Sequence, residues 1–111
     1  IGESDSIERG EAYILSNISG ESVEKYKIEI IKIINSERST KNLYIRVTDP
    51  VLLSQTGGIV QGMSGSPIIQ NGRIIGAVTH VLINDPVYGY GIFIENMLEN
   101  AETSSLNLNA A

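Results

Sequence analysis

A serine set between small residues, directly ahead of an apolar stretch, is the part of this sequence best suited to chemistry. Residues 62–67 read GMSGSP, with Ser64 at the centre. A sharp turn of this kind can project a hydroxyl toward a substrate carbonyl while backbone N–H groups face the developing oxyanion. The segment therefore predicts the nucleophile turn of an acyl-transfer enzyme. A plain structural turn is the alternative, because glycine-rich turns before strands are common.

Two other glycine-containing motifs are excluded by their spacing. The nucleophile elbow of α/β-hydrolases needs a glycine two positions after the serine and then a helix, but Ser66 and Pro67 occupy those places. A phosphate-binding loop needs Gly-Lys followed by Ser or Thr, and no such run follows Gly57, Gly58 or Gly62. Acyl transfer remains the chemistry that the segment favours.

The amino-acid composition limits the kinds of partner and cofactor that this chain could bind. With 13 acidic and 8 basic residues the net charge is −5, which disfavours nucleic acid and anionic membranes as partners. The chain has no cysteine, so disulfides and thiolate metal sites are excluded, and we expect no metal and no cofactor. The Ile-rich stretch 26–34 is interrupted by charges and is too short for a membrane span, which needs about 20 apolar residues.

Short apolar runs separated by turn signals indicate the elements that position this serine. The runs cover 12–18, 25–34 and 43–48, and we expect three strands of a meander. Alternation is clearest in 43–48, where every second residue is apolar. The run 25–34 also fits a helical stripe, and its β-branched richness favours a strand.

The chain after the serine predicts a hairpin. PIIQ and RIIGAVTHVLI are joined by Asn71-Gly72, the dipeptide best suited to a two-residue type I′ turn. A last strand is expected over 88–94, where two glycines permit close backbone approach or a bulge. A short helix over 95–100 would then close the domain.

The hairpin that follows makes the serine segment a more specific functional signal than a glycine-containing turn alone. Trypsin-like peptidases carry a glycine, any residue, the nucleophilic serine, a glycine, a small residue and a proline, and then such a hairpin; this sequence is similar. Residues 56–69, 76–81, 84–86 and 89–91 further resemble the SpoIVB peptidases of endospore-forming bacteria, peptidase family S55. The resemblance covers most of the chain from Gly10 to Leu98.

The resemblance implies a mainly β fold: an antiparallel half-barrel or barrel of the trypsin-like double β-barrel type, with a short C-terminal helix. Residues 1–100 would be the C-terminal, nucleophile-bearing portion of the peptidase domain, and 101–111 a flexible polar tail. We expect the chain to be an excised or processed piece of something longer. A half-barrel would expose apolar surface, so pairing between copies is a further expectation.

The same resemblance assigns roles to residues. Ser64 matches the nucleophile, and the backbone N–H groups of Gly62 and Ser64 match the oxyanion hole. Asp49, fifteen residues before Ser64 and followed by Pro50, matches the acidic residue of the triad. A competing interpretation of Asp49 stays open, because Asp-Pro is a common turn opener whose carboxylate caps its own loop.

The general base is not evident in this chain. A serine hydroxyl needs a positioned imidazole to accept its proton, and the family's catalytic histidine lies far upstream, outside anything that aligns. The one histidine, His80, falls with Thr79 and Val81 on the return strand, a candidate substrate-binding strand. A subsite role, a packed or surface histidine, and a non-standard base all remain open. By this reasoning the chain alone is an incomplete catalyst.

A departure from trypsin-like zymogens concerns Met63. In those zymogens the residue before the serine is an aspartate that pairs with a newly freed N-terminal amine. Methionine cannot form that ion pair, so activation by such an insertion is not expected, despite the N-terminal Ile1-Gly2.

The leading functional prediction is a serine endopeptidase, or part of one, that hydrolyses peptide bonds. By resemblance it is a sporulation signalling protease, exported into the space between the two forespore membranes. There it would cleave itself and then a membrane-complex partner, triggering sigma factor processing. The alternative is a catalytically inert β-domain that serves as a peptide-binding or autoinhibitory interaction module.

Overall fold

The structure is a computed structural model, and it describes residues 6–16, 23–35, 41–58, 63–82 and 84–98. Six strands, one helix and a second helical segment at 94–98 lie along these residues. In chain order, the elements before that segment are β1 (Gly10–Ser16), β2 (Glu24–Ile33), β3 (Leu43–Val47), α1 (Pro50–Thr56), β4 (Pro67–Gln70), β5 (Arg73–Val81) and β6 (Tyr88–Phe93).

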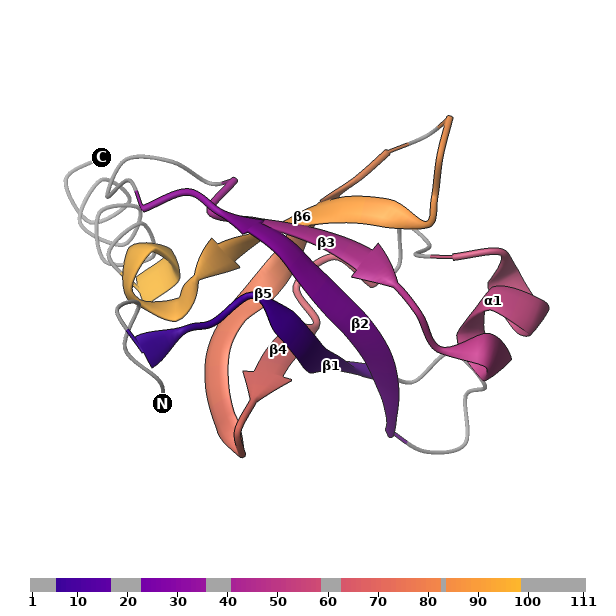
Figure 1. The fold of residues 1–111 in the computed structure, drawn as a ribbon, viewed down its shortest axis with the longest axis horizontal. Coiled ribbons are helices and arrows are strands. Elements are labelled where there is room, and N and C mark those ends of the chain that lie inside the picture. Colours follow the sequence, from indigo (N-terminus) through magenta and orange to yellow (C-terminus); the bar gives the residue numbers. More distant parts are fainter. Residues whose placement is uncertain (1–5, 17–22, 36–40, 59–62, 83, 99–111) are drawn as a thin grey trace, which may run out of the picture.

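The strands form a closed barrel in the order β1-β2-β3-β6-β5-β4, and neighbouring strands are antiparallel. Two long-range pairings complete the ring: β3 pairs with β6, and β1 pairs with β4 through Tyr13–Ile69 and Ile14–Ile68. Figure 1 shows the strongly twisted strands crossing around a common interior. The predicted mainly β, antiparallel fold is confirmed, and the open choice between half-barrel and barrel resolves to a closed barrel.

Alternating side chains fill the barrel. Leu43, Ile45 and Val47 of β3 are buried while Tyr44 and Arg46 between them are partly exposed, as the alternation predicts. The interior is mostly aliphatic; its fully buried members include Ile14, Ile28, Ile30, Leu43, Ile45, Leu52, Met63 and Ile68. This core supports the strand ends that carry the site.

The ambiguous run 25–34 is a strand. β2 pairs with β1 on one side and with β3 on the other, so its backbone groups are satisfied in two ladders. Tyr26, Ile28 and Ile30 face the core while Lys27 lies exposed between them. The β-branched residues therefore decide against the helical stripe.

The predicted hairpin joins β4 to β5. Asn71 and Gly72 both have positive φ, 53° and 76°, as a type I′ turn requires. Gly91 on β6 shows the predicted close approach, because a Cβ there would lie 2.7 Å from Ile68 Cδ1 and 3.0 Å from the Ala77 carbonyl oxygen. The turn and the close approach hold β4, β5 and β6 in one tight unit.

Two helical segments lie at opposite ends of the barrel (Figure 1). Residues 94–98 are helical, which confirms the predicted short C-terminal helix; its expected last two residues lie outside the described part. Buried Asn42 connects this helix to the barrel, since its side-chain oxygen accepts from Phe93 N at 2.9 Å and Asn96 Nδ2 at 3.1 Å. The other segment, α1, is not predicted by the sequence analysis.

The short α1 depends on its caps. Asp49 is its N-cap, Pro50 stands in its first turn, and Gly57 ends it with φ 75° while donating to the Leu53 carbonyl at 2.9 Å. Proline's fixed φ suits the first helical position, and glycine suits the left-handed end. Leu52 is fully buried and anchors the helix to the core.

Candidate active site

One end of the barrel brings the predicted site residues together. The pairs Arg46–Tyr88, Val81–Gly89 and Pro67–Ala77 place the ends of β3 and β5 beside the starts of β6 and β4. The segment leading to α1 follows β3 directly, and the serine turn precedes β4 directly. Asp49, Ser64 and the strand segment 79–81 therefore share this end, away from the helix of residues 94–98.

The turn that carries Ser64 is fixed on both flanks. Met63 before it is 1% exposed and belongs to the core. Gly65 after it, at φ 90°, donates its N–H to the Val78 carbonyl at 2.7 Å. Ser66 donates to the Met63 carbonyl at 3.0 Å, which closes the turn, and accepts from Val78 N at 3.0 Å.

This geometry leaves Ser64 at the surface. The residue is exposed, while its neighbours are held by the core and by β5. Among the residues the structure describes, none hydrogen-bonds to the Ser64 backbone N–H or hydroxyl. The other predicted oxyanion donor, Gly62, lies outside the described residues. Within the described residues, the Ser64 hydroxyl and backbone N–H are thus left without a protein partner.

The loop between β5 and β6 lies at the same end of the barrel and contacts the chain that leaves α1. A Cβ on Gly58, at φ 145°, would lie only 2.3 Å from the Pro86 carbonyl oxygen and 2.8 Å from Val87 N. Backbone contacts this close admit no side chain. The chain leaving α1 therefore packs directly against the loop between β5 and β6.

Asp49 is held by three backbone donors. Its Oδ1 accepts from Val51 N at 2.9 Å and Leu52 N at 3.2 Å, and its Oδ2 accepts from Lys27 N at 3.0 Å. Burial alone would raise the pKa of Asp49, but the hydrogen bonds from Lys27, Leu52 and Val51, with the charge of Lys27, outweigh it and lower that pKa. Asp49 is therefore an ionised helix cap that also connects α1 to β2.

Capping α1 does not use every acceptor position of the Asp49 carboxylate. An ionised carboxylate offers about four acceptor positions, and three are used here. The remaining position on Oδ2 is the one through which Asp49 could orient an imidazole. Both predicted roles of Asp49, cap and triad acid, are compatible with this geometry, and the capping contacts are the ones present.

The predicted substrate-binding strand has an edge without a β4 partner. β4 pairs with β5 only as far as Ala77, and a bulge between Val78 and His80 bends β5 beyond that point. Leu82 N donates to the Tyr88 carbonyl at 3.3 Å, so by alternation the backbone groups of Val81 face away from β6. An extended peptide could pair there, next to the serine turn.

His80 lies on the outer face of this strand. It pairs with Tyr90 across the β5–β6 ladder and is exposed. Its Nδ1 is 2.9 Å from Thr79 Oγ1, and Thr79 Oγ1 donates to the Tyr90 carbonyl at 3.3 Å. The side chain is therefore oriented by its own strand.

Three tyrosines extend this outer face, and sequence reasoning missed them as a group. The Tyr44 ring stacks on Tyr88 at 5.5 Å and meets Tyr90 at 5.1 Å, and Lys41 Nζ lies 5.3 Å from the Tyr90 ring. Burial, and then the neighbouring groups, raise the pKa of Tyr44. Strand alternation predicts that these tyrosines point outward from β3 and β6. The sequence does not show, however, that β3 and β6 pair.

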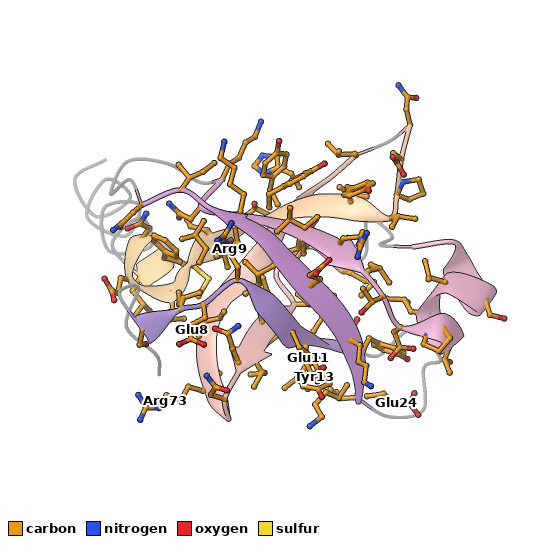
Figure 2. The ribbon with its side chains drawn as sticks, in the orientation of Figure 1. Glu8, Arg9, Glu11, Tyr13, Glu24 and Arg73 are labelled. Atoms are coloured by element: carbon orange, nitrogen blue, oxygen red, sulfur yellow. The ribbon has the colours of Figure 1, made fainter. Side chains whose placement is uncertain are left out.

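A second group of polar side chains lies on β1 and β2 (Figure 2). Tyr13 donates to Glu11 at 2.6 Å, and Lys25 Nζ lies 4.5 Å from the Tyr13 ring. The hydrogen bond to Glu11, with smaller contributions from burial and charge, raises the pKa of Tyr13. Because neither β1 nor β2 pairs with β5 or β6, we treat this group as a solvated surface cluster.

No metal site or membrane helix is found within the part of the chain that the structure describes. No three His, Asp or Glu side chains there lie close enough together to hold a metal ion. None of the described helices has the length and apolar character needed to cross a membrane.

Fold and site together define a class. A closed antiparallel barrel with an exposed serine on a glycine-containing turn is consistent with a trypsin-like serine peptidase barrel. The family model described as SpoIVB peptidase S55 matches residues 1–98, so the chain belongs to that family of serine peptidases. The sequence resemblance is thereby confirmed. A comparison with curated proteins found no match.

Proposed function

We propose that this chain supplies the nucleophile of a serine endopeptidase and that Ser64 is that nucleophile. The observation that carries the proposal is an exposed Ser64 on a turn whose flanks, Met63 and Gly65, are fixed by the core and by β5. Such a turn needs little reorganisation to support a tetrahedral intermediate. Family membership supports the same reaction class.

In the proposed reaction, Ser64 Oγ attacks the scissile carbonyl carbon as its proton passes to a general base. The Ser64 N–H, with that of Gly62, stabilises the oxyanion. The C–N bond then breaks, the base returns the proton to the leaving amine, and an acyl-enzyme remains. Water repeats these steps, releases the acid and restores the hydroxyl.

The base, on this proposal, is an upstream histidine contributed by polypeptide outside this chain, with Asp49 orienting it. His80 is the less suitable candidate because it lies on the strand that the resemblance assigns to substrate binding and is exposed on its outer face. By the family resemblance, the full protein would cleave itself and a membrane-complex partner between the forespore membranes. That cleavage would trigger sigma factor processing.

Cleavage of a peptide substrate by the full polypeptide tests the nucleophile. We expect Ser64→Ala to abolish turnover, with a loss of about 10⁴-fold or more, while Ser66→Ala, in the same turn, stays near the wild-type rate. Full activity of the Ser64 variant would remove the proposal.

A second function is favoured by the β5 edge beyond Ala77. An inert module could bind an extended peptide there by strand addition without cutting it. In that case peptide binding would persist in this chain while no serine in the full polypeptide reacted with a covalent inhibitor. Binding together with Ser64-dependent cleavage would identify the edge as part of a peptidase cleft.

A further inference from the structure

Thr79 Oγ1 lies between two partners, the Tyr90 carbonyl oxygen and His80 Nδ1. A hydroxyl has one hydrogen, and Thr79 Oγ1 donates it to the Tyr90 carbonyl at 3.3 Å. Toward His80 Nδ1, 2.9 Å away, the same oxygen can only accept. Because the Tyr90 carbonyl can only accept, one arrangement satisfies all three groups, and we infer it: the neutral ring carries its hydrogen on Nδ1, which donates to Thr79 Oγ1, and its lone pair on Nε2.

With this tautomer, the lone pair of Nε2 is open to solvent. His80 is exposed, and no side chain or backbone group of the described residues hydrogen-bonds to Nε2. Tyr90, directly across the β5–β6 ladder, lies on the same face. The His80 ring is therefore a hydrogen-bond acceptor of fixed orientation beside the unpaired edge of β5.

A peptide bound at that edge would place side chains beside His80. The peptide residue that lies opposite Val81 points its side chain to the same side as Val81, which packs against the core. Because side chains alternate along a strand, the residues flanking it lie on the outer face, where His80 stands. One flanking side chain thus meets the ring.

We propose that His80 is a specificity-determining residue that selects a substrate side chain carrying a hydrogen-bond donor, such as Thr, Ser or Asn. Thr79 is its positioning residue, since its hydroxyl sets the tautomer. The inference rests on the proposed function of the β5 edge as a substrate-binding strand. It names the chemistry of one subsite of that cleft.

The tautomer can be measured directly in this chain, which contains a single histidine. In ¹⁵N-labelled protein at a pH of about 8.5, where imidazoles are ordinarily neutral, nitrogen–proton correlation spectra should show Nδ1 protonated and Nε2 unprotonated. Thr79→Ser should keep this pattern, and Thr79→Val should lose it. A protonated Nε2 in the unaltered chain would overturn the proposal.

The selectivity is tested with the full polypeptide on matched peptides that carry Thr or the isosteric Val at each position before the scissile bond. At one position we expect Thr to be preferred about fivefold in kcat/KM, the effect of one hydrogen bond. His80→Phe, which keeps a ring, should remove that preference and change the rate on the Val peptide by less than about twofold.

The two proposals fail differently. If Ser64→Ala does not stop cleavage, the proposed function is wrong whatever His80 does. If cleavage depends on Ser64 but no position prefers Thr, or His80→Phe keeps the preference, only the role of His80 is wrong. Thr79→Ser should retain the preference that Thr79→Val loses, which separates tautomer control from a general packing effect.

Discussion

Asp49 and Ser64 lie at the same end of the barrel and are held in opposite ways. Three backbone N–H groups bind the carboxylate of Asp49, so removing it disturbs α1 and β2 together. The Ser64 side chain is exposed, and its position comes from its neighbours Met63 and Gly65. Asp49 therefore contributes to stability through its own side chain, whereas Ser64 is positioned by the residues around it.

The largest expected effect comes from Asp49→Ala. This change removes the cap of α1, worth about 1 kcal/mol, and the hydrogen bond from Lys27 N, worth about 1 kcal/mol. Denaturant unfolding should show the free energy of unfolding reduced by about 2 kcal/mol. A loss no greater than that of an exposed surface substitution would contradict the capping role.

Gly65→Ala should have the next largest effect. The glycine has φ 90°, and nothing lies within 4 Å of an added Cβ, so the cost is backbone strain without a clash. We expect about 1.5 kcal/mol less stability by the same unfolding measurement. In the full polypeptide, the activation free energy of cleavage should rise by more than the free energy of unfolding falls, because the substitution displaces the turn that carries Ser64. Unchanged cleavage would show that the turn geometry is unimportant.

The pH dependence of stability tests the charge of Asp49. Its pKa is lowered in the folded state, so its contribution is fully present above the unfolded value of about 3.9. That contribution is lost as the pH falls through the folded pKa. Asp49→Asn keeps the cap but cannot accept from Lys27 N, and should cost about 1 kcal/mol at neutral pH.

Thermal or chemical unfolding across acidic pH supplies the readout for that variant. The difference between wild type and Asp49→Asn should shrink as the pH falls below about 3.9. A constant difference would mean that the charge of Asp49 contributes nothing to stability.

The smallest effect on stability is expected from Ser64→Ala. Since Ser64 makes no hydrogen bond with the other residues the structure describes, the free energy of unfolding should change by less than about 0.5 kcal/mol. Ser66→Ala serves as the matched control in the same turn. A loss of 2 kcal/mol or more in Ser64→Ala, on the scale of buried hydrogen bonds, would mark Ser64 as structural and remove the contrast with Asp49.

Much of the fold follows from local sequence signals. Alternation in Leu43–Val47 and the Asn71-Gly72 turn predict β3 and the β4–β5 hairpin. Closure of the barrel depends on pairings such as Tyr13–Ile69, which join distant segments that no local pattern connects. The helix α1 was missed because its seven residues carry little periodicity and depend on caps at Asp49 and Gly57.

The site was partly predictable for the same reason. The glycine spacing around Ser64 indicates a turn with an exposed hydroxyl, and the structure has that turn. The hydrogen bond from Lys27 to Asp49 and the Thr79–His80 pair depend on tertiary register and rotamers. The outer tyrosines needed the β3–β6 pairing before Tyr44 and Tyr90 could be placed together.

Labelling of the full polypeptide with a fluorophosphonate, followed by mass-spectrometric mapping of the modified residue, tests the central claim most directly. The probe reacts with a serine hydroxyl only when a base activates it and main-chain donors hold the phosphoryl oxygen. We predict a single adduct on Ser64 that is absent in Ser64→Ala and retained in Ser66→Ala. An adduct on another serine, or none in a polypeptide that cleaves peptides, would contradict the assignment of Ser64 as the nucleophile.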